Sequence, residues 1–248
     1  MNTSTDYKPS QSFGLLLVGP PGSGKTTLAL NFPGIYLFDA DNNLSGPSRY
    51  HKDKPFFYDI GTVKDGAEIP PFKRYTHMAT CLAEAVANPD VEAIAVDSMT
   101  NVVDFIIDDI KRQRGITESK RFDENNNMRI QDWGTLAYYI KHLVTSLRAC
   151  GKPIIFTVHD AVVQDEADNI FRTFLAIPGQ TRNTFAGLFS DVWNCYAAEE
   201  RVKGERRRVF KVRTIPTRAT DSRGLKDSLG LPLEFDADWS VIAKALQQ

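Results

Sequence analysis

The sequence has little of what marks secreted, zinc-binding or membrane-spanning proteins. It contains three cysteines in 248 residues, Cys81, Cys150 and Cys195, and no C-x-x-C pair. Cysteines this few and this far apart argue against a zinc site and against a disulfide framework. No apolar run approaches the roughly 18 residues of a membrane-spanning helix, and residues 1–12 lack the apolar segment of a signal peptide. These absences predict a cytoplasmic protein that does not enter a membrane.

Strong charge, repeats and low-complexity segments are also missing. The 30 basic and 31 acidic residues leave a net charge of −1, so any surface that binds an anion must be local. With 42% hydrophobic residues, the chain is long enough to bury a full α/β core. We expect a loose N-terminal tail over residues 1–12 and one domain over residues 13–248.

The most informative stretch is residues 19–26, which read G-P-P-G-S-G-K-T and match the P-loop pattern G-x-x-x-x-G-K-T. A strand-like run precedes it and a helix-like run follows, a context that a chance glycine turn does not explain. Glycines let backbone N–H groups wrap a phosphate, and the helix start adds the positive end of its dipole. The predicted nucleotide-binding residues are Gly19, Pro21, Gly22, Ser23, Gly24, Lys25, Thr26 and Thr27.

Within this loop, two side chains have predicted roles in binding a nucleotide and its metal ion. Lys25 is expected to reach the β- and γ-phosphates, and the Thr26 hydroxyl is expected to bind Mg²⁺. Asp97 ends the apolar run 93–96. Because ligands of open α/β sheets bind at the carboxyl ends of the strands, Asp97 is the expected second Mg²⁺ residue. The alternative for Asp97 is a helix-capping residue without a metal role.

Hydrophobic patterning predicts alternating strands and helices. We expect strands at residues 13–18, 35–38, 54–60, 93–98 and 153–158, and helices at residues 25–31, 75–87, 99–110, 129–149 and 239–246. Trp133 is assigned to the buried stripe of the long helix. Runs 188–197 and 207–214 predict an antiparallel hairpin. The order of elements predicts an α/β fold with a mostly parallel sheet, flanking helices and antiparallel edge strands.

At these motifs the sequence resembles RecA-type ATPases. The run I-A-V-D-S at residues 94–98 is similar to their Walker B strand, without the Asp-Glu pair of the general AAA+ pattern. The resemblance implies a RecA-like P-loop NTPase core that uses ATP and Mg²⁺. It places a catalytic carboxylate at the exit of strand 35–38, where Asp41 stands in place of the usual Glu. Because Asp is shorter, slow hydrolysis or a role for Asp39 is implied.

His159 ends the run 154–159, where RecA-like proteins place a polar sensor of the γ-phosphate. The resemblance therefore implies a catalytic sensor role, although a single histidine is more often structural. His51, His77 and His142 match no such position, and we interpret them as surface or packing residues.

A finer resemblance is to phage nucleotide-binding AAA proteins, some of which act in single-strand annealing or recombination. It is carried by the runs G-P-P-G-S-G-K-T-T, F-D-A-D, V-D-S, I-Q-D-W-G, T-V-H, I-P-G-Q-T-R-N and K-D-S-L-G-L-P. It implies a phage protein that acts in the cytoplasm of a bacterial host. Single-stranded DNA, further copies of the chain in a filament or ring, and a single-strand-binding protein are the implied partners.

The same resemblance assigns the two long polar connections to DNA. Residues 111–128, predicted to form a mobile loop, match the first DNA loop of the RecA core, and residues 160–184 match the second. The candidate DNA contacts are Arg112, Arg114, Lys120, Arg121, Phe122, Arg172, Phe174 and Arg182. In RecA-like filaments a neighbouring subunit completes the ATP site, for which Arg213, Arg218 and Lys226 are candidates. Solvated loops and an exposed sheet edge are the structural alternatives.

Two other functions stay open on the sequence alone. A small-molecule kinase acting on nucleosides or nucleotides shares the P-loop and needs an arginine-rich lid, for which residues 111–121 are a candidate. A non-catalytic, nucleotide-dependent adaptor such as a helicase loader is consistent with Asp41 in place of Glu.

Overall fold

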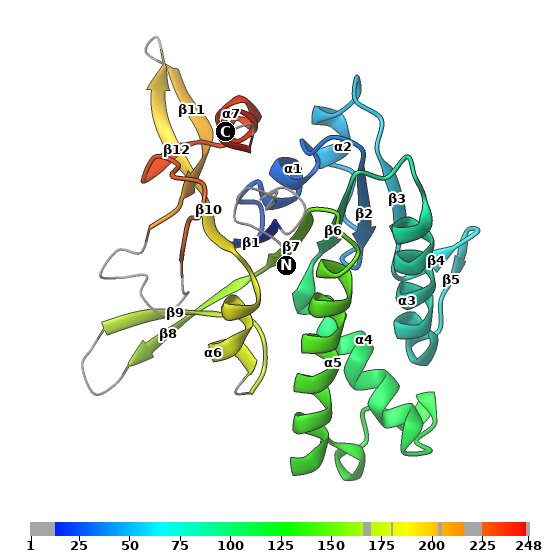
Figure 1. Cartoon of the computed structure of the whole chain (residues 1–248). Coiled ribbons are helices and arrows are strands. Elements are labelled where there is room, and N and C mark those ends of the chain that lie inside the picture. The colour runs from blue at the N-terminus through cyan, green and yellow to red at the C-terminus, as the bar shows by residue number, and fades with distance from the viewer. Residues whose placement is uncertain (1–12, 166–169, 180, 203–204, 216–224, 247–248) are drawn as a thin grey trace, which may run out of the picture.

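The computed structural model describes residues 13–165, 170–179, 181–202, 205–215 and 225–246 (Figure 1). Its main sheet has eight strands: β1 (Gly14–Val18), β2 (Ile35–Asp39), β3 (Phe57–Ile60), β6 (Ala93–Asp97), β7 (Ile154–Val158), β10 (Asp191–Val202), β11 (Glu205–Arg213) and β12 (Glu234–Asp236). Across the sheet they lie in the order β12-β11-β10-β1-β7-β6-β2-β3.

The sheet is parallel from β10 to β3, and β11 and β12 continue it antiparallel at one edge. This confirms the predicted α/β class with its antiparallel edge strands. Every residue of β1, β2, β6 and β7 is buried. Complete burial is typical of central parallel strands, because the crossover helices cover both faces of the sheet.

Helices cover the two faces of the sheet and form two hydrophobic cores. The helices are α1 (Lys25–Ala29), α2 (Pro47–Tyr50), α3 (Pro71–Ala87), α4 (Met99–Gln113), α5 (Ile130–Arg148), α6 (Thr181–Phe185) and α7 (Trp239–Leu246). On one face, α3, α4 and α5 pack against Phe38, Ile94 and Phe156. On the other face, α1 and α7 pack around Leu37 and Trp193. Figure 1 shows α3, α4 and α5 grouped together, apart from α1 and α7.

The sequence prediction differs from the structure in the two long connections. Residues 111–128 are not one irregular loop: α4 continues to Gln113, and the 3-10 helices η3 (Glu118–Lys120) and η4 (Glu124–Asn126) follow. The second connection holds an antiparallel pair, β8 (Asp160–Asp165) and β9 (Ile170–Leu175). Both strands are stabilised by pairing with each other, which a search for local hydrophobic runs does not detect.

Smaller differences concern element ends and short elements. α3 begins at Pro71, a residue type that suits a first helical turn. β10 begins at Asp191 and runs to Val202, later at both ends than predicted. Two further short elements are a hairpin of β4 (Val63–Lys64) with β5 (Ala67–Glu68) and the 3-10 helix η5 (Ala186–Leu188). The turn predicted near residues 203–204 lies outside the described residues.

Trp133 is 40% exposed, which corrects its assignment to the buried stripe of α5. Asp132 takes the buried position instead, because Arg114 forms an ion pair with its carboxylate at 2.8 Å. Of the other predicted stripe residues, Leu143 is half-buried and the rest are buried: Leu136, Ile140, Val144 and Leu147. None of the described helices combines the length and the apolar character that crossing a bilayer requires.

Candidate nucleotide-binding site

The P-loop joins β1 to α1 in a conformation that needs glycine. Gly22 and Gly24 have φ angles of +72° and +88°, in the left-handed region that side chains with a Cβ rarely adopt. Gly19 lies so close to the Cys195 carbonyl of β10 that a Cβ there would collide with it. The loop therefore keeps its shape through Gly19 and Gly24, which the pattern G-x-x-x-x-G-K-T specifies, and through Gly22 at one of its variable positions.

The predicted nucleotide residues from Pro21 to Thr27 line one cavity of about 310 Å³. Asp41, Asp97 and His159 line the same cavity, so residues far apart in the sequence meet beside the loop. A larger cavity of about 800 Å³ lies between β5 and α3, and no P-loop residue lines it. The chemistry of the lining residues, rather than the cavity volume, identifies the candidate site.

The Lys25 ammonium is buried at the base of the loop, where the side chain is 4% exposed. Its Nζ donates to the carbonyl oxygens of Gly19 at 2.8 Å and Pro20 at 2.9 Å, and it lies 3.4 Å from Nδ1 of His159. Burial lowers the pKa of Lys25, and the Asp97 carboxylate opposes that shift. A phosphate that enters the loop would compete with these carbonyls for the ammonium.

Thr26 and Asp97 meet at the cavity wall. The Thr26 hydroxyl donates to Oδ2 of Asp97 at 2.6 Å, and the Thr157 hydroxyl donates to Oδ1. Burial raises the pKa of Asp97, and these two hydrogen bonds oppose the shift. A hydroxyl and a carboxylate side by side fit the oxygen ligands that Mg²⁺ prefers.

No three His, Cys, Asp or Glu side chains gather into a metal-binding cluster within the part of the chain that the structure describes. A cation at Thr26 and Asp97 would need further oxygen ligands from elsewhere. Nucleotide phosphates and water supply such ligands at Mg²⁺–nucleotide sites. The residues therefore fit a metal ion that arrives with its nucleotide better than a permanently held one.

Asp41 is fixed by donors from two other elements. Its Oδ1 accepts hydrogen bonds from the N–H of Ser98 at 3.0 Å and from the Ser98 hydroxyl at 2.8 Å. Its Oδ2 lies 3.4 Å from Nε2 of His159. Burial alone would raise the pKa of Asp41, but hydrogen bonds from His159 and Ser98 lower it overall. Asp41 is therefore a charged carboxylate, held by a serine that the sequence analysis did not single out.

Asp39 shapes the turn that carries Asp41. It is 1% exposed and accepts hydrogen bonds from the N–H groups of Asp41 at 3.0 Å and Asn43 at 2.9 Å. Burial raises the pKa of Asp39 to about 6. Asp41 lines the cavity and Asp39 does not, so the geometry favours Asp41 over the alternative acid.

His159 lies between the cavity and the β8–β9 hairpin. Its ring faces Lys25 through Nδ1 and Asp41 through Nε2, each at 3.4 Å. Its carbonyl oxygen accepts the N–H of Ala176 at 2.8 Å, and Asp160, the next residue, begins β8. One tautomer satisfies both ring contacts, with Nδ1 as the acceptor and Nε2–H as the donor.

Comparison with protein families agrees with this geometry. A family model described as an AAA domain matches residues 13–223. The chain belongs to this AAA-domain family. Its P-loop, cavity and mostly parallel sheet are those of a nucleotide-binding P-loop NTPase domain. No curated protein matches the chain.

The first group of DNA candidates in this AAA domain divides into ion-paired and exposed side chains. Arg112 pairs with Asp109 at 2.7 Å, Arg114 with Asp132 at 2.8 Å and Arg121 with Asp108 at 3.3 Å. Lys120 is exposed. Phe122 is 82% exposed and lies 4.4 Å from the Arg121 guanidinium. The pairs of Arg114 and Arg121 hold the segment onto α5 and α4, whereas the Arg112 pair lies within α4. Lys120 and Phe122 stay at the surface of the segment.

The second group surrounds the β8–β9 hairpin. The Arg182 guanidinium of α6 lies 5.3 Å from the ring centre of Phe174 on β9. Arg182 is exposed and Phe174 is half-buried. The backbone of Arg172 lies in β9, and its side chain is outside the described part of the structure.

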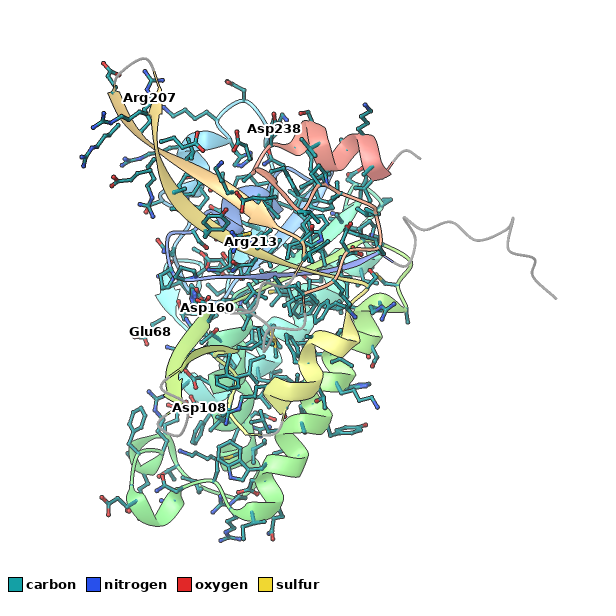
Figure 2. The ribbon with its side chains drawn as sticks, turned by 90° about the vertical axis from the view of Figure 1, so that its left-hand side faces the viewer. Glu68, Asp108, Asp160, Arg207, Arg213 and Asp238 are labelled. Atoms are coloured by element: carbon teal, nitrogen blue, oxygen red, sulfur yellow. The ribbon has the colours of Figure 1, made fainter. Side chains whose placement is uncertain are left out.

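The three candidates for completing a neighbour's ATP site are differently placed. Arg213 pairs with Glu234 at 2.7 Å and lies over the Tyr196 ring at 5.1 Å. Lys226 forms a backbone bridge with Val192, and burial lowers its pKa. Arg218 lies outside the described residues. In Figure 2, Arg207 marks the far end of the β10–β11 hairpin, and Arg213 lies nearer the middle of the molecule.

Two residues of β11 contact the P-loop, a role that no sequence motif predicts for them. Arg208 donates to the carbonyl oxygen of Gly22 at 2.8 Å, and Phe210 lines the cavity. The alternation of positions along a strand puts both side chains on one face. The sequence shows that Arg208 and Phe210 share a face of the strand. Only the order of strands in the sheet decides that this face meets the P-loop.

Proposed function

We propose that this AAA domain is an ATPase that binds single-stranded DNA and promotes annealing or strand exchange. The observation that carries the proposal is the position of His159. Its ring contacts Lys25 and Asp41 in the nucleotide cavity, and its backbone starts the β8–β9 hairpin. A change at the terminal phosphate would therefore shift His159 and with it the β8–β9 hairpin, which carries candidate DNA contacts.

In the proposed reaction each side chain has one task. Lys25 binds the terminal phosphates, and Thr26 and Asp97 hold Mg²⁺, which neutralises phosphate charge when it is bound. The lowered pKa of Asp41 keeps its carboxylate charged at neutral pH. The charged carboxylate orients the attacking water and accepts a proton from that water. The shorter side chain of Asp, compared with Glu, supports slow hydrolysis.

The proposed DNA surface consists of two aromatic and basic groups. Phe122 and Lys120 form the first group, and Phe174 and Arg182 form the second. Aromatic rings stack on unpaired bases, and basic groups contact phosphates. Arg114 and Arg121 form ion pairs with α5 and α4, so we assign them the role of holding the first group in place, and Arg112 pairs within α4.

Self-association into a filament or ring belongs to the same proposal. Arg213, Arg218 and Lys226 would complete the ATP site of a neighbouring copy, and a single-strand-binding protein is a further proposed partner. The setting would be the cytoplasm of a bacterium infected by a phage, as the sequence resemblance implies.

The kinase alternative has less support than the ATPase. Its lid would be residues 111–121, but no described residue of that segment lines the P-loop cavity. Ion pairs hold Arg114 against α5 and Arg121 against α4 instead, and Arg112 pairs within α4. The adaptor alternative predicts an ATPase rate near background even with DNA present, which a direct rate measurement distinguishes.

Fluorescence anisotropy of a labelled oligonucleotide tests the proposal. The wild type should bind single-stranded DNA more tightly with a non-hydrolysed ATP analogue than without nucleotide. Phe122→Ala should weaken binding by roughly tenfold at every salt concentration, and Lys120→Ala should lower the salt dependence. Tyr58→Ala, which removes an exposed ring from β3 at the far edge of the sheet, is the matched control.

His159→Gln tests the coupling itself. The variant should still bind nucleotide and DNA, but its DNA affinity should no longer respond to the ATP analogue. Absence of DNA binding by the wild type in both nucleotide states would refute the proposed function.

A further inference from the structure

The face of the P-loop opposite the carboxylates is covered by strand β11. Nη2 of Arg208 donates to the carbonyl oxygen of Gly22 at 2.8 Å. Phe210, two residues along the same strand, lines the cavity with its ring. The Arg208 guanidinium lies 5.4 Å from the centre of the Phe210 ring, so the two side chains form one continuous surface.

Glycine at position 24 permits this approach. A Cβ at Gly24 would stand 3.1 Å from two ring carbons of Phe210, closer than ordinary van der Waals contact. The ring therefore lies directly against the backbone of the phosphate-binding loop. Phe210 remains half-buried and Arg208 is exposed, so neither side chain is enclosed in the hydrophobic core.

The order of strands defines the two ends of the cavity. Asp97, His159 and Asp41 follow or end β6, β7 and β2, which all lie on one side of β1. β10 and β11 lie on the other side of β1. The P-loop follows β1 and so separates a carboxylate end of the cavity from an aromatic end.

A nucleoside triphosphate is a linear molecule with a base at one end and the terminal phosphate at the other. In the proposed function the terminal phosphate faces Asp41 and His159, so the base must point away from them. Gly46 and Pro47 also line the cavity, but they follow β2 and lie on the carboxylate side. The side chain available at the opposite end is Phe210.

We infer that Phe210 and Arg208 form the base-binding subsite of this chain and hold a purine by stacking. An aromatic ring offers its face to a nucleobase, and the wider face of a purine gains more from it than a pyrimidine does. The Arg208 guanidinium lies beside the Phe210 ring, 5.4 Å from its centre, and its hydrogen bond to Gly22 joins β11 to the loop. The inference rests on the proposed use of the cavity for a nucleoside triphosphate.

The subsite predicts that only ligands with a base are sensitive to Phe210. Titration calorimetry would compare ATP with inorganic triphosphate, both with Mg²⁺. Phe210→Leu keeps the apolar bulk and removes the aromatic face. It should weaken ATP binding by roughly tenfold and leave triphosphate binding unchanged. Phe210→Trp should restore ATP affinity. ATP should bind more tightly than CTP to the wild type and to Phe210→Trp, but not to Phe210→Leu.

A matched control comes from the same hairpin. Tyr196 on β10 also lies under a guanidinium, that of Arg213 at 5.1 Å, but it does not line the cavity. Tyr196→Leu should bind ATP and triphosphate as the wild type does. Arg208→Lys keeps the charge and loses the planar group, so it should weaken ATP binding and spare triphosphate.

Two other calorimetric results would overturn the inference, and a third would overturn the proposed function. Equal weakening of ATP and triphosphate in Phe210→Leu would overturn the inference, because the ring would then only shape the loop. Unchanged ATP affinity in that variant would place the base elsewhere and overturn it too. Failure of the wild type to bind either ligand would instead overturn the proposed function itself.

Discussion

The Asp41 carboxylate lies 3.4 Å from Nε2 of His159, although one follows β2 and the other follows β7. Ser98 fixes the same carboxylate from a third element, between β6 and α4. The acid proposed to orient water is therefore held by residues that follow two other strands, β6 and β7. This arrangement makes the proposed chemistry testable residue by residue.

Asp41→Asn should separate hydrolysis from nucleotide binding. The amide keeps the size of the side chain but cannot accept a proton from water, so kcat should fall about a hundredfold or more. Nucleotide affinity should change little, because Lys25 and the P-loop are untouched. Steady-state hydrolysis and calorimetry measure the two quantities. A variant that hydrolyses ATP at the wild-type rate would remove Asp41 from the mechanism.

Thr26→Ala should remove the effect of Mg²⁺ on nucleotide binding. The Thr26 hydroxyl lies 2.6 Å from Asp97 and is one of the two predicted ligands. The wild type should bind ATP more tightly with Mg²⁺ than with EDTA, and the variant should show a much smaller difference. Thr80→Ala, at an exposed position of α3, serves as the control. An undiminished Mg²⁺ effect in Thr26→Ala would argue against this site.

Asp39 should make the folded protein more stable as the pH falls through 6. Its pKa is raised to about 6 in the folded chain by burial, above the value near 3.9 of an unfolded chain. Between these values the folded state binds a proton that the unfolded state does not, so lowering the pH favours folding. The stabilisation that Asp39 contributes is complete below its pKa in the unfolded chain and is lost above its pKa in the folded chain.

Urea unfolding at several pH values, without divalent cations, measures this effect. The difference in free energy of unfolding between the wild type and Asp39→Asn should shift in favour of the wild type from pH 7 to pH 4. A constant difference over that range would show that Asp39 does not titrate as described.

Arg114→Ala should destabilise the segment between α4 and α5. Arg114 and Asp132 pair with side-chain exposures of 15% and 9%, and Arg114 also donates to the Asn127 carbonyl at 3.0 Å. Removing Arg114 leaves the buried Asp132 carboxylate without its ion-pair partner, although the Arg129 N–H still donates to it at 2.8 Å. This loss costs about 3 kcal/mol of unfolding free energy. Arg206→Ala removes an ion pair whose side chains are 73% and 76% exposed, and it should cost less than about 1 kcal/mol. Similar losses in the two variants would contradict this account.

Much of the nucleotide site follows from local sequence. The local sequence specifies the conformation of the P-loop, because Gly24 of the pattern and Gly22 at a variable position suit backbone angles that other residues avoid. The rule for parallel sheets placed Asp97 at the carboxyl edge, and the resemblance to RecA-type ATPases implied the positions of Asp41 and His159. The α/β class followed from the alternation of apolar runs.

Other parts of the site depend on contacts between distant segments. The sequence contains Ser98, Arg208 and Phe210, but no local pattern indicates that they meet Asp41, Gly22 and the cavity. The β8–β9 hairpin also escaped detection, because neither strand is a long apolar run. Arginines 112, 114 and 121 gave the same basic signal as Lys120, and only their ion pairs distinguish them.

The sequence by itself determined the phosphate-binding loop, the acids at the strand ends and the class of fold. Those features depend on backbone angles and hydrophobic period, which neighbouring residues encode. The tertiary structure decided which strand lies beside the loop, which arginines are already paired and which aromatic ring closes the cavity. These depend on strand order and on charges brought together by packing, and neither is a property of any short stretch of chain.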